Sequence, residues 1–229
     1  MTVSVSAIVP IYNEEKFLKE SVNNLLKVNE IEKIFLVDDC STDNSKSIME
    51  HLNSKYEKIE IFETSMNGGK GKAILTMQNH LKTDYVIIHD ADLEYSPLDI
   101  PNMIKSINTD NFNLVLGSRF INKNKKQIYL RTFIANKLLS KIFSIIYRVN
   151  VTDIATCYKL MPTSYFKNEK FLESGFAIEV ELLAKYFNKN KNYKEVPISY
   201  KARSYEEGKK IKLLDGFKYL FAMFKYRFY

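Results

Sequence analysis

Cysteine, tryptophan and long apolar runs are scarce in this chain of 229 residues. There is no tryptophan, and the two cysteines, Cys40 and Cys157, lie far apart in the sequence. The sequence therefore predicts neither a cysteine-based zinc site nor a disulfide framework, and it suits a reducing cytosol. No stretch approaches the roughly 20 apolar residues of a membrane-spanning helix. The first residues have no basic region of the kind that opens a signal peptide. We therefore expect any membrane contact to be peripheral.

Acidic residues are outnumbered by basic ones, 27 to 34, which gives a formal net charge of +7. This excess favours anionic partners without choosing between nucleotides, lipid surfaces and nucleic acid. A merely basic soluble protein would have the same charge. The hydrophobic content of 45% over 229 residues suffices for one sizeable core, so we expect a single domain over residues 1–229.

Runs of β-branched residues alternate with helical periodicity along the chain, which predicts an α/β fold with a mostly parallel central sheet flanked by helices. Pro197 places the last predicted strand, 194–200, towards an edge of the sheet. Two long helices, 128–149 and 213 onwards, are amphipathic and basic. Core packing explains their apolar stripes, and contact with an anionic membrane is the alternative. The other expected strands are 3–11, 31–37, 59–62, 85–88 and 112–116, and a short strand follows Asp153.

Carboxylates follow two of the predicted buried strands, at the point where each strand ends. Asp90 and Asp92 come directly after 85–88, and Asp38 and Asp39 come after 31–37. The carboxyl ends of parallel strands form one edge of a sheet, where ligands bind in open α/β folds. Asp90 and Asp92 suit a divalent cation that carries phosphates, and Asp38 or Asp39 suits a base or a ribose.

Three other segments near this edge allow more than one interpretation. Asn13 and the acids after it suit the start of a helix as well as a site. Arg119, after the strand 112–116, suits a phosphate or a structural ion pair. The glycine-rich segment around Lys70 opens a helix predicted over 73–81 and suits close approach to a phosphate or a base. It matches neither the Walker spacing nor the dinucleotide fingerprint.

Four motifs of the first half recur in a known family: Ile8-Val9-Pro10-Ile11-Tyr12-Asn13-Glu14, Leu36-Val37-Asp38-Asp39-Cys40-Ser41-Thr42-Asp43, Gly69-Lys70-Gly71-Lys72-Ala73 and Asp90-Ala91-Asp92. Together they resemble the family-two glycosyltransferases of the GT-A fold. The second half adds Gly117-Ser118-Arg119-Phe120, Asp153, Thr156-Cys157-Tyr158-Lys159, Gly175-Phe176, Glu195-Val196-Pro197-Ile198 and 203–211. These motifs narrow the resemblance to the dolichyl- or polyprenyl-phosphate mannosyl- and glucosyltransferase branch, and the resemblance covers nearly the whole chain.

The resemblance implies a nucleotide-sugar-binding half, residues 1–120, and an acceptor-side half, residues 121–229. It implies that Mg²⁺ or Mn²⁺ is held by Asp90 and Asp92, with Glu94 as a further candidate ligand. The groups it implies for catalysis are Asp92, Arg119, Arg203 and Lys209, the three cations facing phosphates of the donor or of a lipid acceptor. The implied nucleotide-sugar-binding residues are Pro10, Tyr12, Glu14, Val37, Asp38 or Asp39, Lys70, Asp90 and Ala91.

The function that these residues predict is the transfer of a hexose, with inversion, from a UDP-glucose or GDP-mannose type of donor to a polyprenyl or dolichyl phosphate. A hydroxyl acceptor in cell-surface glycan synthesis is the alternative, and it would need a general base such as Asp153, Glu179 or Glu181. A sugar nucleotidyltransferase and a non-catalytic scaffold are more distant alternatives. We expect a cytoplasmic protein, peripheral at the membrane face, with no nucleic-acid partner. The sequence does not indicate an oligomeric state.

Overall fold

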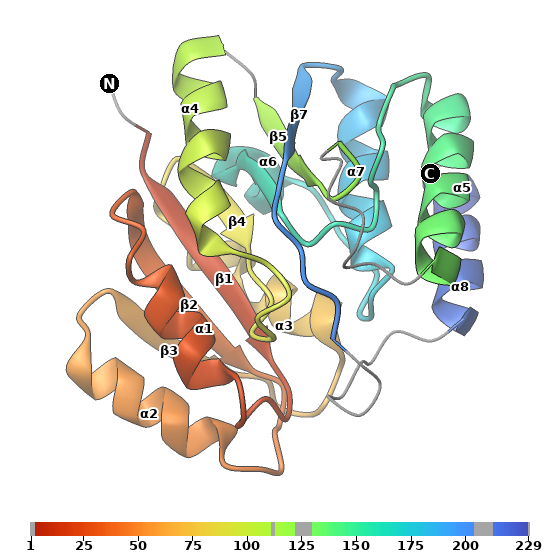
Figure 1. Cartoon of the computed structure of the whole chain (residues 1–229). Helices are drawn as coiled ribbons and strands as arrows, with labels where there is room; N and C mark the ends of the chain where they lie inside the picture. Colours follow the sequence, from red (N-terminus) through yellow and green to blue (C-terminus); the bar gives the residue numbers. More distant parts are fainter. Residues whose placement is uncertain (1–2, 111–112, 122–129, 204–212, 229) are drawn as a thin grey trace.

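The computed structural model describes residues 3–110, 113–121, 130–203 and 213–228. Within these ranges seven strands form a mixed sheet in the order β3-β2-β1-β4-β6-β5-β7 (Figure 1). β6 is antiparallel to both of its neighbours, and the other pairs are parallel. The predicted α/β architecture with a mostly parallel sheet is therefore confirmed. The strands are β1 (Val5–Ile11), β2 (Ile31–Asp38), β3 (Ile59–Glu63), β4 (Tyr85–Ile88), β5 (Leu114–Ser118), β6 (Lys159–Pro162) and β7 (Tyr193–Pro197).

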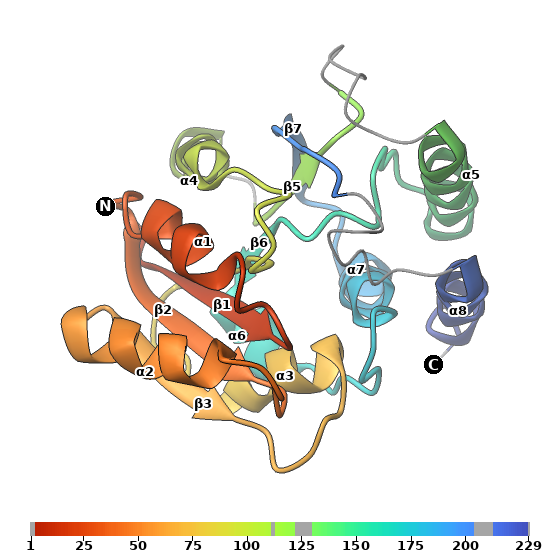
Figure 2. The same ribbon diagram turned by 60° about the horizontal axis from the view of Figure 1, so that its bottom comes forward.

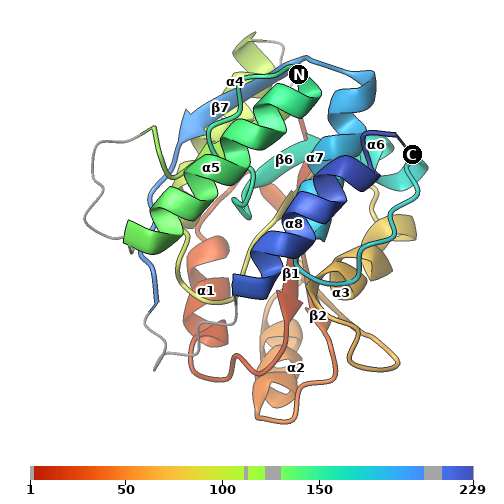
Figure 3. The ribbon, with the colours of Figure 1, turned by 90° about the vertical axis from the view of Figure 1, so that its right-hand side faces the viewer.

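Helices cover both faces of this sheet. Figures 2 and 3 place α1 (Leu18–Leu25) and α4 (Ile100–Asp110) on one face. α3 (Lys70–Thr76), α6 (Thr163–Asn168) and α7 (Ile178–Lys189) lie on the other. The inner strands β1, β4 and β5 are almost wholly buried, as β-branched runs in parallel sheets are, whereas the edge strands β3 and β7 are partly exposed. α2 (Ser45–Lys55) connects β2 to β3, and short 3₁₀ turns occur at Met77–Asn79 and Pro97–Asp99.

Two long helices lie side by side at one end of the sheet: α5 (Leu130–Tyr147) and α8 (Leu213–Lys225) (Figure 3). Their C-terminal ends are joined, because the Tyr147 hydroxyl donates a 2.7 Å hydrogen bond to the Met223 carbonyl. α7 packs behind them and is almost wholly buried. None of the helices in the described ranges is long and apolar enough to cross a membrane.

The predicted strands and helices occur, and their ends differ most where tertiary contacts intervene. α3 begins at Lys70, before the predicted start at residue 73, because the chain turns at Gly69, whose φ is +89°. The Lys72 amide then donates to the Ser174 carbonyl at 2.9 Å. A Cβ on Gly71 would lie 2.2 Å from the Glu173 carbonyl oxygen. This glycine is therefore required by close approach to the protein's own backbone. β7 lies at the edge of the sheet, as Pro197 predicts.

Candidate active site

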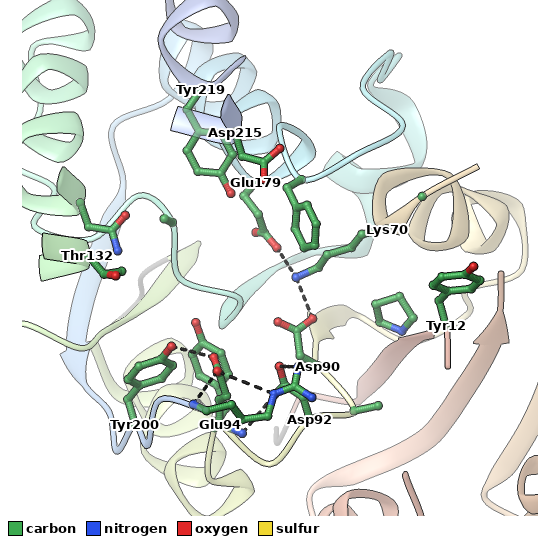
Figure 4. Close-up of a pocket in the computed structure, with 18 of the residues that line it drawn as sticks. Tyr12, Lys70, Asp90, Asp92, Glu94, Thr132, Glu179, Tyr200, Asp215 and Tyr219 are labelled. Carbon is green, nitrogen blue, oxygen red and sulfur yellow. Dashed lines mark hydrogen bonds and ion pairs between the residues drawn. The ribbon is translucent and has the colours of Figure 1, made fainter. Parts of the chain in front are cut away.

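The carboxyl ends of β1, β2 and β4 border a cavity of about 410 Å³. Because these three strands are parallel neighbours, the segments that follow them meet at one edge of the sheet. Residues from the second half of the chain close the cavity on the other side (Figure 4). Of the residues predicted for the site, those that line the cavity are Pro10, Tyr12, Glu14, Asp39, Lys70, Asp90, Ala91, Asp92, Glu94, Arg119, Glu179 and Arg203.

The predicted site residues that do not line the cavity serve other contacts or fall outside the described ranges. Asp38 accepts hydrogen bonds from the Ser41 amide at 3.1 and 3.2 Å, and Val37 is fully buried in the sheet. Asp153 and Glu181 are also fully buried. Lys209 lies outside the residues that the structure describes.

Asp39 links the end of β2 to the glycine-rich segment. Its carboxylate accepts hydrogen bonds from the Gly68 amide at 2.9 Å and the Gly69 amide at 2.6 Å. The Thr64 hydroxyl donates to it as well, at 2.9 Å. Asp39, rather than Asp38, is thus the acid of this pair that faces the cavity, and its position is set by backbone donors.

Asp90 is one member of a buried chain of charges that crosses the cavity. The Lys70 ammonium lies 2.7 Å from Asp90 Oδ1 and 2.7 Å from Glu179 Oε1 (Figure 4). Lys159, which is fully buried, pairs with the other oxygen of Glu179. α7 therefore reaches the end of β4 through Lys70, which joins the two halves of the chain.

Asp92 is held by a second cation, the guanidinium of Arg203. Arg203 Nη2 lies 2.9 Å from Asp92 Oδ2, and Nη1 lies 3.1 Å from Glu14 Oε2. The Arg203 amide also donates to Glu94 Oε1 at 2.9 Å, and the Tyr200 hydroxyl donates to the other Glu94 oxygen at 2.6 Å. Arg203 Nε also lies 3.8 Å from Glu94 Oε1, so three carboxylates from two segments converge on one guanidinium.

The two acids that follow β4 differ in their electrostatic surroundings. Burial, together with the nearby Asp90 and Glu94, raises the pKa of Asp92 to about 7. Burial acts in the same direction on Asp90, but the ammonium of Lys70 outweighs it and lowers the pKa of that carboxyl. Although burial opposes its charge, the neighbouring acids raise the pKa of Lys70 well above the ordinary value. Ionisation of Asp92 is therefore disfavoured, chiefly by burial, and a further cation beside it would favour the ionised carboxylate.

Arg119 contacts an acid and an aromatic ring at the edge of the cavity. Its Nε and Nη2 donate to the two oxygens of Asp153, each at 2.7 Å, and its guanidinium lies 4.9 Å from the centre of the Tyr200 ring. A bidentate pair of this kind holds the guanidinium in one orientation. Of the two alternatives for Arg119, the structural ion pair is present, and contact with a phosphate stays a prediction.

The two acids on α7 point in different directions, as their spacing of two residues predicts. Glu179 faces the cavity, whereas Glu181 accepts hydrogen bonds from the Leu172 amide at 2.9 Å and the Glu173 amide at 2.8 Å. Lys185 pairs with Glu181 at 2.9 Å. Glu181 thus fixes the segment before α7, and Glu179 contributes to the cavity.

Comparison with known proteins now identifies the family of this chain. The model of the family described as Glycosyl transferase family 2 matches residues 6–169, which is more than half of the chain and includes the strand-end acids of the cavity. The chain belongs to glycosyl transferase family 2. It is a glycosyltransferase, and the predicted resemblance is confirmed.

Relatives of this glycosyltransferase include enzymes named for dolichyl phosphate. It is 31% identical to the UDP-N-acetylglucosamine--dolichyl-phosphate N-acetylglucosaminyltransferase of Methanococcus voltae, over 94% of this chain and 93% of that protein. It is 27% identical to the dolichol-phosphate mannosyltransferase of Pyrococcus furiosus, over 95% of this chain and 62% of that protein. These two relatives agree with the branch that the sequence resembles.

The fold of this glycosyltransferase is also found in a solved structure. It is similar to glucosyl-3-phosphoglycerate synthase from Mycobacterium tuberculosis, in complex with Mn²⁺, uridine diphosphate and phosphoglyceric acid. The TM-score is 0.75 at 15% sequence identity, over 98% of this chain and 78% of that one. This likeness supports the GT-A fold.

One interpretation of the N-terminal turn of this glycosyltransferase is wrong. Asn13 does not cap α1, which begins after Phe17 without a side-chain cap. The Asn13 side chain instead accepts a 2.7 Å hydrogen bond from the Thr42 amide, and Glu15 accepts from the Asn44 amide at 3.0 Å. The turn is therefore built to hold two strand ends together, and it leaves Glu14 to face Arg203.

Sequence reasoning missed several residues that line the cavity or support it. Tyr200, Asp215 and Tyr219 line it from segments late in the chain. Asp215 and Tyr219 lie one helical turn apart on α8. This polar pair on a largely apolar helix was the signal in the sequence that could have indicated a contact with the site. His89 lies behind Asp90, where burial lowers the pKa of its ring to about 4, and it contacts Ser21 and Tyr158 at 3.0 Å each. Its neutral ring supports the floor of the site.

Proposed function

We propose that this glycosyltransferase moves a hexose, or an N-acetylated hexosamine, from a nucleoside diphosphate sugar to a polyprenyl or dolichyl phosphate. The observation that carries the proposal is one cavity with two kinds of wall. Its floor is formed by the charged residues after β1, β2 and β4, and its far side is formed by α5 and α8. The names of the relatives from Methanococcus voltae and Pyrococcus furiosus support the same acceptor class.

The donor would lie along the strand ends. Pro10, Tyr12 and Asp39 line the part of the cavity next to the glycine-rich segment, where a nucleoside fits. Lys70 and Arg203 are the cationic groups nearest to Asp90 and Asp92, and they would contact the diphosphate. Charge that develops on the leaving diphosphate would therefore meet cationic groups that are already fixed in place.

A divalent cation fits the acids of this site. Burial, and in second place the neighbouring acids, disfavours the charge of Asp92, and a cation beside it would offset both. Mg²⁺ and Mn²⁺ prefer carboxylate and phosphate oxygens. In the described residues, no three acidic, histidine or cysteine side chains are grouped to hold a metal unaided. Asp90 and Asp92 would therefore hold the cation together with donor phosphate oxygens, and the cation would supply charge neutralisation of the diphosphate. Glu94 is a further candidate ligand on the same segment.

A phosphate acceptor suits the acids on the acceptor side. It is already ionised and needs no strong general base, whereas a hydroxyl acceptor does. Asp153 is held by Arg119, Glu179 by two lysines, and Glu181 by Lys185 and backbone amides. These contacts make the three acids structural partners of neighbouring groups. They support a reaction in which the acceptor is an ionised phosphate and no protein carboxylate has to take up its proton.

The outer faces of α5 and α8 support attachment at the cytoplasmic face of a membrane. Exposed apolar side chains and basic ones share these faces, the combination found on helices that lie on anionic bilayers. Leu130 is 72% exposed and Phe217 is 71% exposed. The exposed apolar residues of this pair of helices and the segment after α8 are Leu130, Ile134, Leu138, Ile145, Phe217, Phe221, Phe224 and Phe228. We call this set the apolar face.

The test is a transfer assay with purified protein and either Mg²⁺ or Mn²⁺. UDP-N-acetylglucosamine, UDP-glucose and GDP-mannose are each supplied with and without polyprenyl phosphate, and lipid-linked sugar is measured. We expect a lipid product from at least one donor, with release of the nucleoside diphosphate. Transfer only to a soluble hydroxyl acceptor would contradict the proposal, and release of pyrophosphate would indicate a nucleotidyltransferase.

A further inference from the structure

α8 carries a glycine that neither its backbone nor its packing requires. Gly69 is the one glycine of the described residues with a positive φ, so Gly216 lies within α8 without needing the freedom of a glycine. A Cβ added at Gly216 would meet no atom of the described residues within 4 Å. Alanine would be the more favourable residue in such a helix. The glycine therefore leaves space beside α8 that a larger side chain would fill, which suggests that the space has a function.

The space at Gly216 belongs to the cavity. Gly216 lines it together with Tyr219, and Thr132 and Ala135 line it from α5. Figure 4 shows Thr132 on one side of the cavity and Tyr219 on another. α5 and α8 are joined at their C-terminal ends, so it is their N-terminal halves that border the cavity.

The surroundings of this opening change from charged to apolar over a short distance. Inside are the cationic groups Lys70 and Arg203 with their acids. Outside, on the same turns of the two helices, Ile134 and Phe217 are exposed. A ligand that fits both regions has an ionised head and a long apolar tail.

We propose that Gly216 keeps open a path between the N-terminal halves of α5 and α8, and that the apolar chain of the lipid phosphate acceptor leaves the cavity by this path. Gly216 is then a residue that sets specificity for long-chain acceptors. The inference rests on the proposed function, because it needs a lipid phosphate acceptor. It adds the position of the acceptor's apolar chain and the residue that leaves room for it.

The experiment compares two substitutions at this position in the full chain. Gly216→Leu places a branched side chain in the path, and Gly216→Ala adds a single methyl group there. For each protein the KM is measured for a long-chain polyprenyl phosphate and for a short, water-soluble isoprenyl phosphate, with the donor saturating. UDP affinity, measured by calorimetry, reports whether the donor side is folded.

We expect Gly216→Leu to raise the ratio of the long-chain KM to the short-chain KM about tenfold, equivalent to ~1.4 kcal/mol. UDP affinity should stay that of the unsubstituted protein, and Gly216→Ala should change the ratio far less. An unchanged ratio in Gly216→Leu, or an equal rise of both KM values, would overturn the inference while leaving the proposed function in place. If the unsubstituted protein uses no lipid phosphate with any donor, the proposed function fails, and the inference fails with it.

Discussion

The two halves of this glycosyltransferase hold their charged side chains in different ways. In the first half, residues 1–120, Asp39 is fixed by the backbone amides of Gly68 and Gly69, so its position follows from the local path of the chain. In the second half, Arg203 and Glu179 form ion pairs with residues of the first half. Asp39 is thus placed by contacts within its own half of the chain, whereas Arg203 and Glu179 are placed by contacts between the halves.

The largest loss of transfer activity should come from substitution of Asp92, which has two other acids nearby. Asp92→Asn removes one charge of the Asp90 and Asp92 pair with little change in shape, and we expect transfer to fall by about 10²–10³-fold, as when one group that stabilises developing charge is lost. Glu63→Gln is the matched control, because Glu63 also ends a parallel strand but is exposed outside the cavity. Steady-state kcat for both proteins decides the outcome. Full activity of Asp92→Asn would contradict the metal-dependent site.

The next largest effect concerns stability and tests the ion pairs by which Arg203 joins the two halves of the chain. Arg203→Gln leaves three carboxylates, Glu14, Asp92 and Glu94, without their shared guanidinium. Because breaking a buried ion pair leaves uncompensated charge, we expect a loss of about 3 kcal/mol in the free energy of unfolding. Mn²⁺ should restore part of this loss, so that it raises the Tm of the variant more than that of the unsubstituted protein.

The control for this measurement is Lys33→Gln, which breaks the exposed pair of Lys33 with Glu60. Exposed pairs contribute at most about 1 kcal/mol, so its stability should barely change. If Mn²⁺ shifts the Tm of Arg203→Gln no more than that of Lys33→Gln, the acids around Arg203 do not bind the cation.

A smaller effect distinguishes the apolar face from the rest of the surface. Phe221→Ser should weaken binding to anionic phospholipid vesicles by about 2 kcal/mol, the transfer free energy of a phenylalanine side chain. Leu98→Ser is the control, because Leu98 is 71% exposed, close to the 69% of Phe221, but lies in the turn before α4. Vesicle co-sedimentation measures both. Equal binding of the two variants would argue against the apolar face as the membrane contact.

The smallest effect concerns the pH dependence of stability and Glu195, an acid that does not line the cavity. Burial raises the pKa of Glu195 to about 6, and its carboxylate accepts hydrogen bonds from the Thr152 and Asp153 amides. A raised folded-state pKa gives stability that is present at low pH and is lost as the pH rises through 6. Relative to Glu195→Gln, the protein should therefore gain about 1 kcal/mol between pH 7 and pH 5. Urea unfolding at both pH values tests this, and an unchanged difference would contradict it.

Local patterns allowed the strand-end acids of the first half to be placed, since a buried strand followed by acids places those acids by chain direction alone. The segments of Asp90 and Asp92, and of Pro10 and Tyr12, lie at the predicted edge of the sheet. The start of α3 was missed because it depends on a contact with residues 173–175, and no sequence rule relates those segments. Arg203 reaches Asp92 across 111 residues of sequence, so its partner could not be inferred from spacing.

The antiparallel strand β6 has a consequence for how this protein can be made and divided. Tyr85, Val86 and Ile87 of β4 pair with Pro162, Met161 and Leu160 of β6, which also pairs with β5. The chain must therefore travel well beyond β5 before the middle of its sheet is complete, and such distant pairing is slow to form. We expect a fragment ending at residue 120 to expose the unpaired edges of β4 and β5 and to aggregate during synthesis.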